Sequence, residues 1–249
     1  MVFGYKSDIG RRRLENQDAV KVFKNNYRML LILCDGMGGH YGGSLASNIA
    51  INVIGQSFML ELPNENESVE AFTAWFKHST DKARNEMLKI ASNDEAKLDM
   101  GTTVTAAYVD LKNQRLFVYN IGDSRTYVLT KSSVLRQIST DHNYMNMLIE
   151  QGLKPKDAAK VHQAHSLTSA LGPNKRTKIE ASDLSDNFHK IRKIIVTSDG
   201  VHSFLSELAL ENLLILDEEP NKLCEKIITM ALDNNSTDNA SIGIIDLEA

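Results

Sequence analysis

Short runs of apolar residues bounded by turn-forming residues recur along the chain, and they predict buried β-strands. In the clearest case the apolar run 30–34 ends in Asp35-Gly36 and a glycine-rich turn. Taken alone, an Asp-Gly pair would indicate a hairpin turn. Similar runs adjoin further aspartates, however, so that the full set is Asp35, Asp123, Asp199 and Asp238. The repetition predicts a rim of carboxylates at the ends of buried strands.

Helical spacing of apolar residues marks the segments 44–60 and 67–91. The spaced positions of the first are Leu45, Ile49, Val53 and Phe58. Those of the second are Val69, Phe72, Phe76, Ala83, Met87 and Ile90. We expect two amphipathic helices that pack side by side. Further helices are expected at 206–214 and at 220–233, where Pro220 suits the first turn.

The remaining segments alternate between strand-like and polar texture. Residues 102–137 are rich in β-branched and aromatic residues and are predicted to form an antiparallel meander. Residues 141–165 are polar and resemble two short helices broken by Gly152 and Pro155, as in a surface insertion or lid. Strands and helices come in blocks rather than in βαβ alternation, which favours antiparallel sheets with helices outside and argues against a Rossmann-type fold.

Composition and charge narrow the class of protein. The chain has 249 residues, 42% of them hydrophobic, a net charge of −4 and a pI of about 6.0, which gives no indication of nucleic-acid or membrane binding. Cys34 and Cys224 are isolated and are expected to be buried and reduced. The charged first residues do not resemble an export signal, and no apolar run approaches the roughly 20 residues of a spanning helix. A cytoplasmic protein is expected.

Aspartates gathered on one rim would repel one another unless cations lie between them. Ligands that are all oxygen suit Mg²⁺ or Mn²⁺. Two such ions can hold a bridging hydroxide for in-line attack on phosphorus. Arg13 could add a planar guanidinium that grips phosphate oxygens, although the arginines at 11–13 could equally be a solvated basic patch.

Eight motifs together resemble the metal-dependent serine/threonine protein phosphatases of type 2C, in their compact bacterial form. They are GRRRLENQD, LCDGMGGH, MGTTVTAA, YNIGDSR, STDHN, LTSALG, IIVTSDGV and STDNASIGII. The resemblance implies an α+β fold, a four-layer α-β-β-α sandwich with two central antiparallel sheets flanked by helix pairs. It also implies a single catalytic domain over 1–249, with the insertion at about 143–167 as a flap beside the active site.

The resemblance further implies the ligands of a metal centre that holds Mn²⁺ or Mg²⁺. Asp35 would bridge two core ions, and the backbone carbonyl of Gly36 would bind the second ion. Asp199 and Asp238 would complete the first. Asp123, together with Asp199, would hold a weaker third ion.

Three other residues receive catalytic roles from the resemblance. Arg13 matches the phosphate-binding arginine, and Asp18 would orient metal-bound water. The sequence departs from many members at Gln17, where they have Glu, and at Met37, where eukaryotic members have the histidine that acts as general acid. His40 could protonate the leaving group instead, or a metal-bound water could do so.

The resemblance implies hydrolysis of phosphoserine and phosphothreonine on proteins, by in-line attack of a metal-bridging hydroxide and in opposition to a serine/threonine kinase. The expected partners are phosphorylated proteins and the cognate kinase, and the protein is expected to be a monomer. One alternative is a catalytically silent regulator that binds phosphoproteins or senses metal, which loss of a ligand would mark; none is lost. Another is a phosphoesterase for small esters or nucleic acid, although the acidic pI disfavours nucleic acid.

Overall fold

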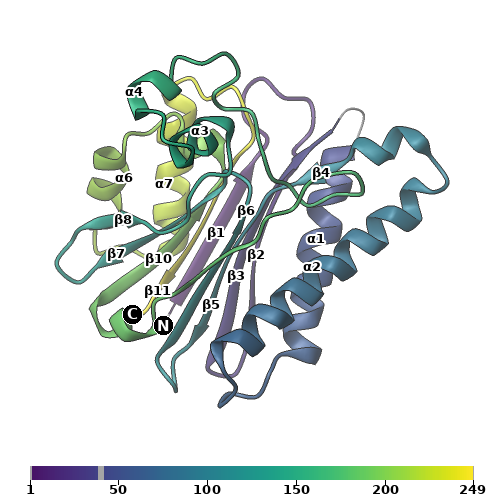
Figure 1. Cartoon of the computed structure of the whole chain (residues 1–249). Coiled ribbons are helices and arrows are strands. Elements are labelled where there is room, and N and C mark those ends of the chain that lie inside the picture. Colours follow the sequence, from purple (N-terminus) through teal and green to yellow (C-terminus); the bar gives the residue numbers. More distant parts are fainter. Residues whose placement is uncertain (1, 39–41, 249) are drawn as a thin grey trace.

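Two antiparallel sheets face each other in the computed structural model, which describes residues 2–38 and 42–248 (Figure 1). In order across the first sheet lie β1 (Val2–Asp8), β11 (Ala240–Asp246), β10 (Ile191–Thr197), β7 (Arg125–Thr130) and β8 (Leu135–Gln137). Across the second lie β2 (Asp18–Asn25), β3 (Arg28–Met37), β5 (Val104–Asp110), β6 (Arg115–Ile121) and β9 (Glu180–Asp183), with β4 (Gly101–Thr102) paired to β3.

Helices cover the outer face of each sheet (Figure 1). The second sheet is covered by α1 (Gly42–Glu61) and α2 (Val69–Ala91), and the first by α6 (Glu207–Leu214) and α7 (Pro220–Asp233). The shorter helices are α3 (Tyr144–Glu150), α4 (Pro155–Ala158), α5 (Asp199–His202), and the 3₁₀ turns η1 (Glu95–Asp99) and η2 (Ser185–Lys190). The predicted α-β-β-α sandwich is confirmed.

The continuous apolar run in β3 is explained by burial on both faces of the strand. Leu30, Ile32 and Cys34 pack toward the helices, whereas Leu31 and Leu33 pack toward the other sheet. Because successive side chains of a strand point to opposite faces, a strand covered on both sides needs apolar residues at every position. Three layers of hydrophobic core result, two under the helices and one between the sheets.

The buried face of α1 differs from the predicted one. Of the four spaced positions only Phe58 is fully buried, while the others, Leu45, Ile49 and Val53, are only partly buried. The fully buried apolar residues are Ala46, Ala50, Ile51, Ile54 and Phe58. Small residues bring the helix close to the sheet: a Cβ at Gly55 would lie 2.0 Å from the ring of Phe23. The spacing therefore predicted the helix but not the centre of its contact face.

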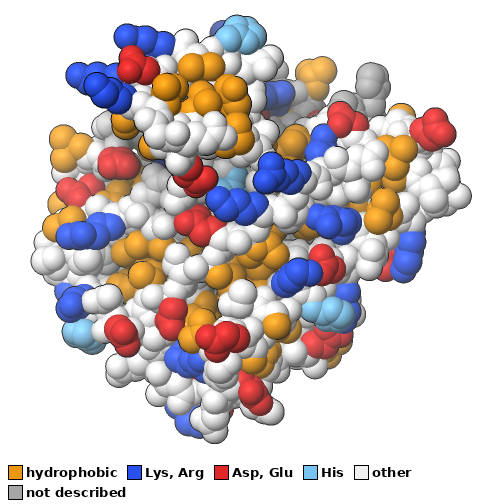
Figure 2. Space-filling model, in the orientation of Figure 1, with side chains coloured by type: hydrophobic (Ala, Val, Ile, Leu, Met, Phe, Trp, Pro, Cys, Tyr) orange, Lys and Arg blue, Asp and Glu red, His pale blue; other side chains and the backbone are white. Residues whose placement is uncertain are grey.

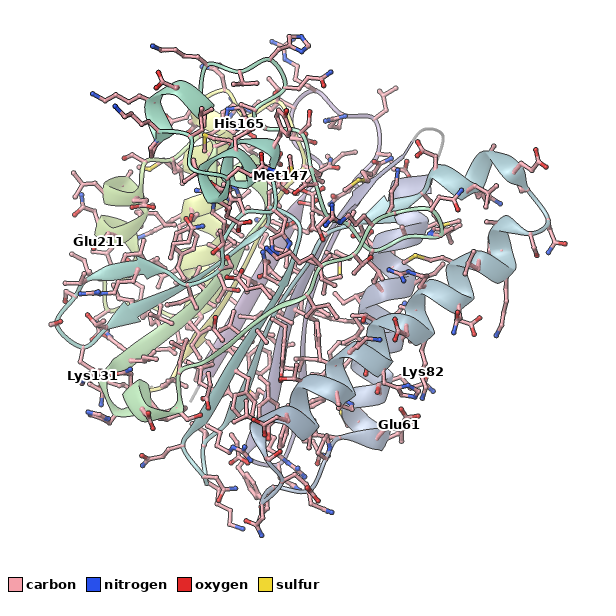
Figure 3. The ribbon with its side chains drawn as sticks, in the orientation of Figure 1. Glu61, Lys82, Lys131, Met147, His165 and Glu211 are labelled. Atoms are coloured by element: carbon pink, nitrogen blue, oxygen red, sulfur yellow. The ribbon has the colours of Figure 1, made fainter. Side chains whose placement is uncertain are left out.

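The two long helices pack side by side, as predicted. Buried hydroxyl and indole groups join them: Trp75 Nε1 and Ser79 Oγ both donate to Ser57 Oγ, at 3.1 and 2.7 Å. At the surface Lys82 of α2 pairs with Glu61 of α1 at 2.6 Å (Figure 3). Apolar packing and these polar contacts hold the helix pair over the second sheet.

The strands predicted as one meander belong to two sheets, which corrects that prediction. The chain leaves the second sheet after β6 and enters the first at β7, through the turn 122–124. Gly122 has φ +102°, a conformation that favours glycine, and the next strand pairs with distant β10 rather than with β6. Local β-propensity carries no information about which strand a segment pairs with. The change of sheet places Asp123 at the point where the two sheets meet.

Other predictions about the chain agree with the structure. Cys34 and Cys224 are buried and free. The two short helices at 144–150 and 155–158 lie at one end of the sandwich, and the first buries none of its residues (Figure 1). Within the described ranges no helix has both the length and the apolar content to cross a membrane.

Candidate functional site

The structure brings the predicted aspartates to one end of the sandwich. Asp35 near the end of β3 pairs in register with Asp18 at the start of β2. Asp199 follows β10 as the first residue of α5, Asp238 stands two residues before β11, and Asp123 lies in the turn between β6 and β7. All four of these neighbours act electrostatically on the Asp35 carboxylate. The strand ends therefore form the shared acidic rim that the sequence predicts.

Burial and mutual repulsion weaken the acidity of these carboxyl groups. Burial, with the neighbouring charges added, raises the pKa of Asp35 well above its ordinary range. Burial likewise raises the pKa of Asp18 to about 6 and that of Asp123 to about 7. The pKa of Asp199 is also raised, chiefly by burial and then by Asp238. One cause shared by these carboxyl groups is the repulsion between like charges at close range. A bound cation would therefore reduce the repulsion among all of them.

Threonine and serine hydroxyls fix the backbone at Asp35. The Asp35 amide donates to Thr103 Oγ1 at 2.9 Å, and the Asp35 carbonyl accepts from the Thr103 amide at 2.8 Å and from Thr102 Oγ1 at 3.0 Å. Thr103 Oγ1 also shares a hydrogen bond of 2.7 Å with Ser124 Oγ, next to Asp123. Sequence reasoning did not assign these hydroxyls. Their place inside the motifs MGTTVTAA and YNIGDSR pointed to the site but not to their partners.

Asp18 is held by a serine that the sequence analysis also did not assign. Ser198 Oγ donates to Asp18 Oδ2 at 2.7 Å and accepts from the Ser241 amide at 2.9 Å. Ser198 directly follows β10 and precedes Asp199, so this hydrogen bond joins the start of β2 in one sheet to the end of β10 in the other. Asp18 is almost fully buried in this arrangement.

Close backbone approaches at the site require glycine at two positions. A Cβ on Gly36 would lie 2.2 Å from the Gly43 carbonyl oxygen and 2.6 Å from that of Gln17. The Gly36 amide donates to that same Gln17 carbonyl at 3.1 Å. At Gly200 a Cβ would lie 1.9 Å from the Asn239 carbonyl oxygen. Both glycines stand immediately after a predicted metal-binding aspartate, where any side chain would displace the neighbouring segment.

Arg13 belongs to the acidic rim, whereas Arg11 does not. Arg13 Nη2 donates to Asp238 Oδ2 at 2.5 Å, and this hydrogen bond, with the charges of Asp199 and Asp35, raises the pKa of the guanidinium. Arg11 pairs instead with Asp233 at the end of α7, at 2.6 Å. The cluster is therefore not a uniform basic patch, because its members have different partners.

The oxygen atoms at the rim are of the kind that binds a hard cation, although the side chains do not converge on a single point. The assembled donors are carboxylate and carbonyl oxygens, which suit Mg²⁺ or Mn²⁺. In residues 2–38 and 42–248 no three His, Cys, Asp or Glu side chains converge as a finished metal site. Arg13 provides positive charge within the same rim through its contact with Asp238. The proposed acid His40 lies outside the described residues.

Comparisons with known proteins agree with this geometry. The family model described as protein phosphatase 2C matches residues 10–232. The serine/threonine phosphatase stp of Listeria monocytogenes is 27% identical over 244 residues, covering 97% of this chain and 94% of that protein. The protein phosphatase PhpP of Streptococcus pneumoniae is 26% identical over 243 residues, covering 97% and 95%.

A solved structure extends the similarity to three dimensions. The crystal structure of the serine/threonine phosphatase Stp1 from Staphylococcus aureus matches with a TM-score of 0.84 and 28% identity, over 100% of this chain and 96% of that one. The sandwich, the acidic rim and a family match over most of the sequence thus lead to one assignment. The chain belongs to the protein phosphatase 2C family.

Proposed function

We propose that this protein hydrolyses phosphoserine and phosphothreonine side chains of proteins, with Mn²⁺ or Mg²⁺, and opposes a serine/threonine kinase in the cytoplasm. It acts as a monomer, and residues 1–249 form one catalytic domain. The observation that carries the proposal is the rim of partly or fully buried aspartates beside Arg13, because it combines a site for cations with a group that binds phosphate.

The acidic rim supplies the metal ligands in this proposal. Asp35 would serve as the ligand common to two core ions, with the backbone carbonyl of Gly36 on one of them and Asp199 and Asp238 on the other. Asp123, together with Asp199, would hold a weaker third ion. When bound, such cations activate water for attack on phosphorus and neutralise charge on the phosphoryl oxygens.

The remaining roles fall to residues around the rim. Arg13 exchanges its contact with Asp238 for the phosphate of the substrate, since the same fork of N–H donors serves either anion. Asp18, held by Ser198, orients the attacking water. His40 stays the sequence-based candidate for the proton that the leaving oxygen requires.

Residues 143–167 are proposed to form the flap. Its base is joined to the rim, because the His142 amide donates to the Gly122 carbonyl at 2.9 Å and the Gly122 amide donates to His142 Nδ1 at 3.2 Å. Gly122 is adjacent to Asp123. A substrate held beneath α3 and α4 would therefore lie next to the proposed third ion.

Turnover of a phosphothreonine peptide tests the proposal. We expect activity with Mn²⁺, none after exhaustive EDTA treatment, and recovery on adding the ion back. Asp35→Asn is the matched variant, since it keeps the size of the side chain and removes its charge. Full turnover without metal would contradict the metal mechanism. Metal binding by calorimetry without turnover would indicate the silent regulator, and a preference for small esters over the peptide would indicate the other phosphoesterase.

A further inference from the structure

A groove of about 610 Å³ opens between the edges of the two sheets. It lies between β7 and β8 of the first sheet and the segment after β9 of the second. The apolar part of its lining comes from four residues, Val128, Ile138, Leu184 and Ile191. Its volume falls within the range of about 300–1,000 Å³ that ligand sites occupy. Figure 2 shows an orange, hollowed area on the left of this face, with blue side chains along its outer edge.

The rim of this groove is basic and is not balanced by acids in its lining. The cationic or titratable residues are Lys131, Arg136, His189 and Lys190, and neither Asp nor Glu lines the groove. Lys131 pairs with Glu248 at 3.1 Å, and Lys190 donates to Asn187 at 3.0 Å. Arg136 and His189 have no side-chain partner among the described residues, in a chain whose net charge is −4. The groove thus offers positive charge around an apolar floor.

This combination selects an acidic peptide with apolar side chains. Phe, Tyr and Trp are absent from the lining, so the groove offers nucleic-acid bases none of the aromatic faces on which they usually stack. We propose that the groove docks an acidic, leucine-bearing segment of the phosphoprotein substrate, away from the phosphorylated residue. This inference rests on the proposed function, because the docked chain is taken to be the substrate.

The distance to the acidic rim sets the spacing of such a substrate. β7 runs from Arg125, two residues after Asp123, to Thr130 at the groove. Five steps of about 3.3 Å cover roughly 17 Å. In Figure 3 Lys131 lies at the lower left of the molecule, well below the labelled flap residues Met147 and His165. The phosphorylated residue and the docked segment must therefore be separated by about five or more extended residues.

Direct binding tests the groove. The probe is a fluorescein-labelled peptide of alternating glutamate and leucine, followed by fluorescence anisotropy. We expect binding that weakens as salt rises from about 50 to about 300 mM, because exposed charges are screened. Arg136→Glu with Lys190→Glu should weaken binding by about tenfold or more. The matched control, Lys21→Glu with Lys24→Glu, changes the same charge on β2 at the opposite edge strand and should leave binding unchanged.

Linked substrates test docking during turnover. A phosphothreonine peptide is joined to the acidic segment by a flexible glycine-serine linker of about twelve residues, whose mean span is about 19 Å. We expect KM to fall about tenfold with kcat unchanged. A linker of about two residues cannot span the distance and should give no gain. Serine for leucine, or lysine for glutamate, in the acidic segment should also remove the gain.

Several outcomes would overturn the docking proposal: no binding of the acidic peptide, equal loss in the two double variants, or tighter binding of single-stranded oligothymidine. Self-association of the wild type that Arg136→Glu abolishes would show that a second copy occupies the groove, and would overturn it too. Turnover of p-nitrophenyl phosphate is measured in parallel and should be unchanged in both variants. If neither the phosphothreonine peptide nor p-nitrophenyl phosphate were turned over while the acidic peptide still bound, the proposed function would fail and the groove would stand as a peptide site.

Discussion

Asp123→Asn should stabilise the metal-free protein while weakening its response to metal. Burial, and then the charge of Asp199, raises the pKa of Asp123 from 3.8 to about 7. A carboxyl group with a raised pKa in the folded state stabilises the fold only while it is protonated. Its contribution is lost as pH rises from the unfolded pKa through the folded one, here from about 4 to about 7. Asparagine keeps the shape of the side chain and removes this dependence.

The magnitude follows from the two pKa values. The ionisation penalty is about 1.5 kcal/mol at pH of about 5 and about 4 kcal/mol at pH of about 8, from 1.36 kcal/mol per unit of pKa. Asp123 is partly exposed, and solvent screens its charge, so we take about half of these values as the lower limit of the ionisation penalty. In EDTA the free energy of unfolding of the variant should therefore be about 2–4 kcal/mol larger than that of the wild type at the higher pH, and the difference should be much smaller at the lower pH.

Urea unfolding at both pH values measures this difference. The variant's gain in EDTA should grow with pH, and a titration with Mn²⁺ should stabilise the wild type more than the variant, because the proposed third site loses a charged ligand. Asp186→Asn, on exposed η2, is the matched control for removing one negative charge. An equal gain at both pH values, or none at the higher one, would refute the reasoning about the buried carboxylate.

Arg13→Ala should lower kcat/KM by about two to four orders of magnitude, since two charged hydrogen bonds are worth about 1.5–3 kcal/mol each. Arg11→Ala should stay within a few-fold of wild type, and equal, modest losses in both would instead indicate a general basic patch. Asp35→Ala should abolish high-affinity Mn²⁺ binding in calorimetry, and unchanged binding would remove this residue from the ligand set. Ser198→Ala should lower the free energy of unfolding by about 1–3 kcal/mol, because buried Asp18 loses a donor; an unchanged urea midpoint would contradict this.

Much of the architecture could be predicted from local pattern. Burial on both faces of the strand makes the β3 run continuously apolar. Helical spacing marks α2, where four of the six spaced positions are fully buried and Val69 and Ile90 are partly buried, and it marks the range of α7. The buried face of α1 was harder to predict. Alanine and glycine are small, so a hydrophobic pattern gives them little weight, yet they let that helix approach the sheet most closely.

Some residues of the candidate site could likewise be predicted from the sequence, and others could not. Aspartates placed next to strand-like apolar runs are visible in the sequence, and so is Arg13 within its motif. The hydroxyls of Thr103, Ser124 and Ser198 gain their meaning only from partners on other strands. A hydroxyl in a strand motif looks the same whether it faces solvent or holds a carboxylate, so spacing alone could not assign them.

By itself the sequence predicted most of the strands and helices, proposed which residues carry the chemistry, and indicated the family to which the chain belongs. Only the tertiary structure decided that the chain changes sheets at 122–124, that Arg13 contacts Asp238, and that a basic rim surrounds an apolar groove. The physical reason is the separation along the chain of the residues that interact. Periodicity reports which face of an element is buried, whereas pairing and side-chain contacts join residues as far apart as 13 and 238, and these are fixed only when the whole chain packs.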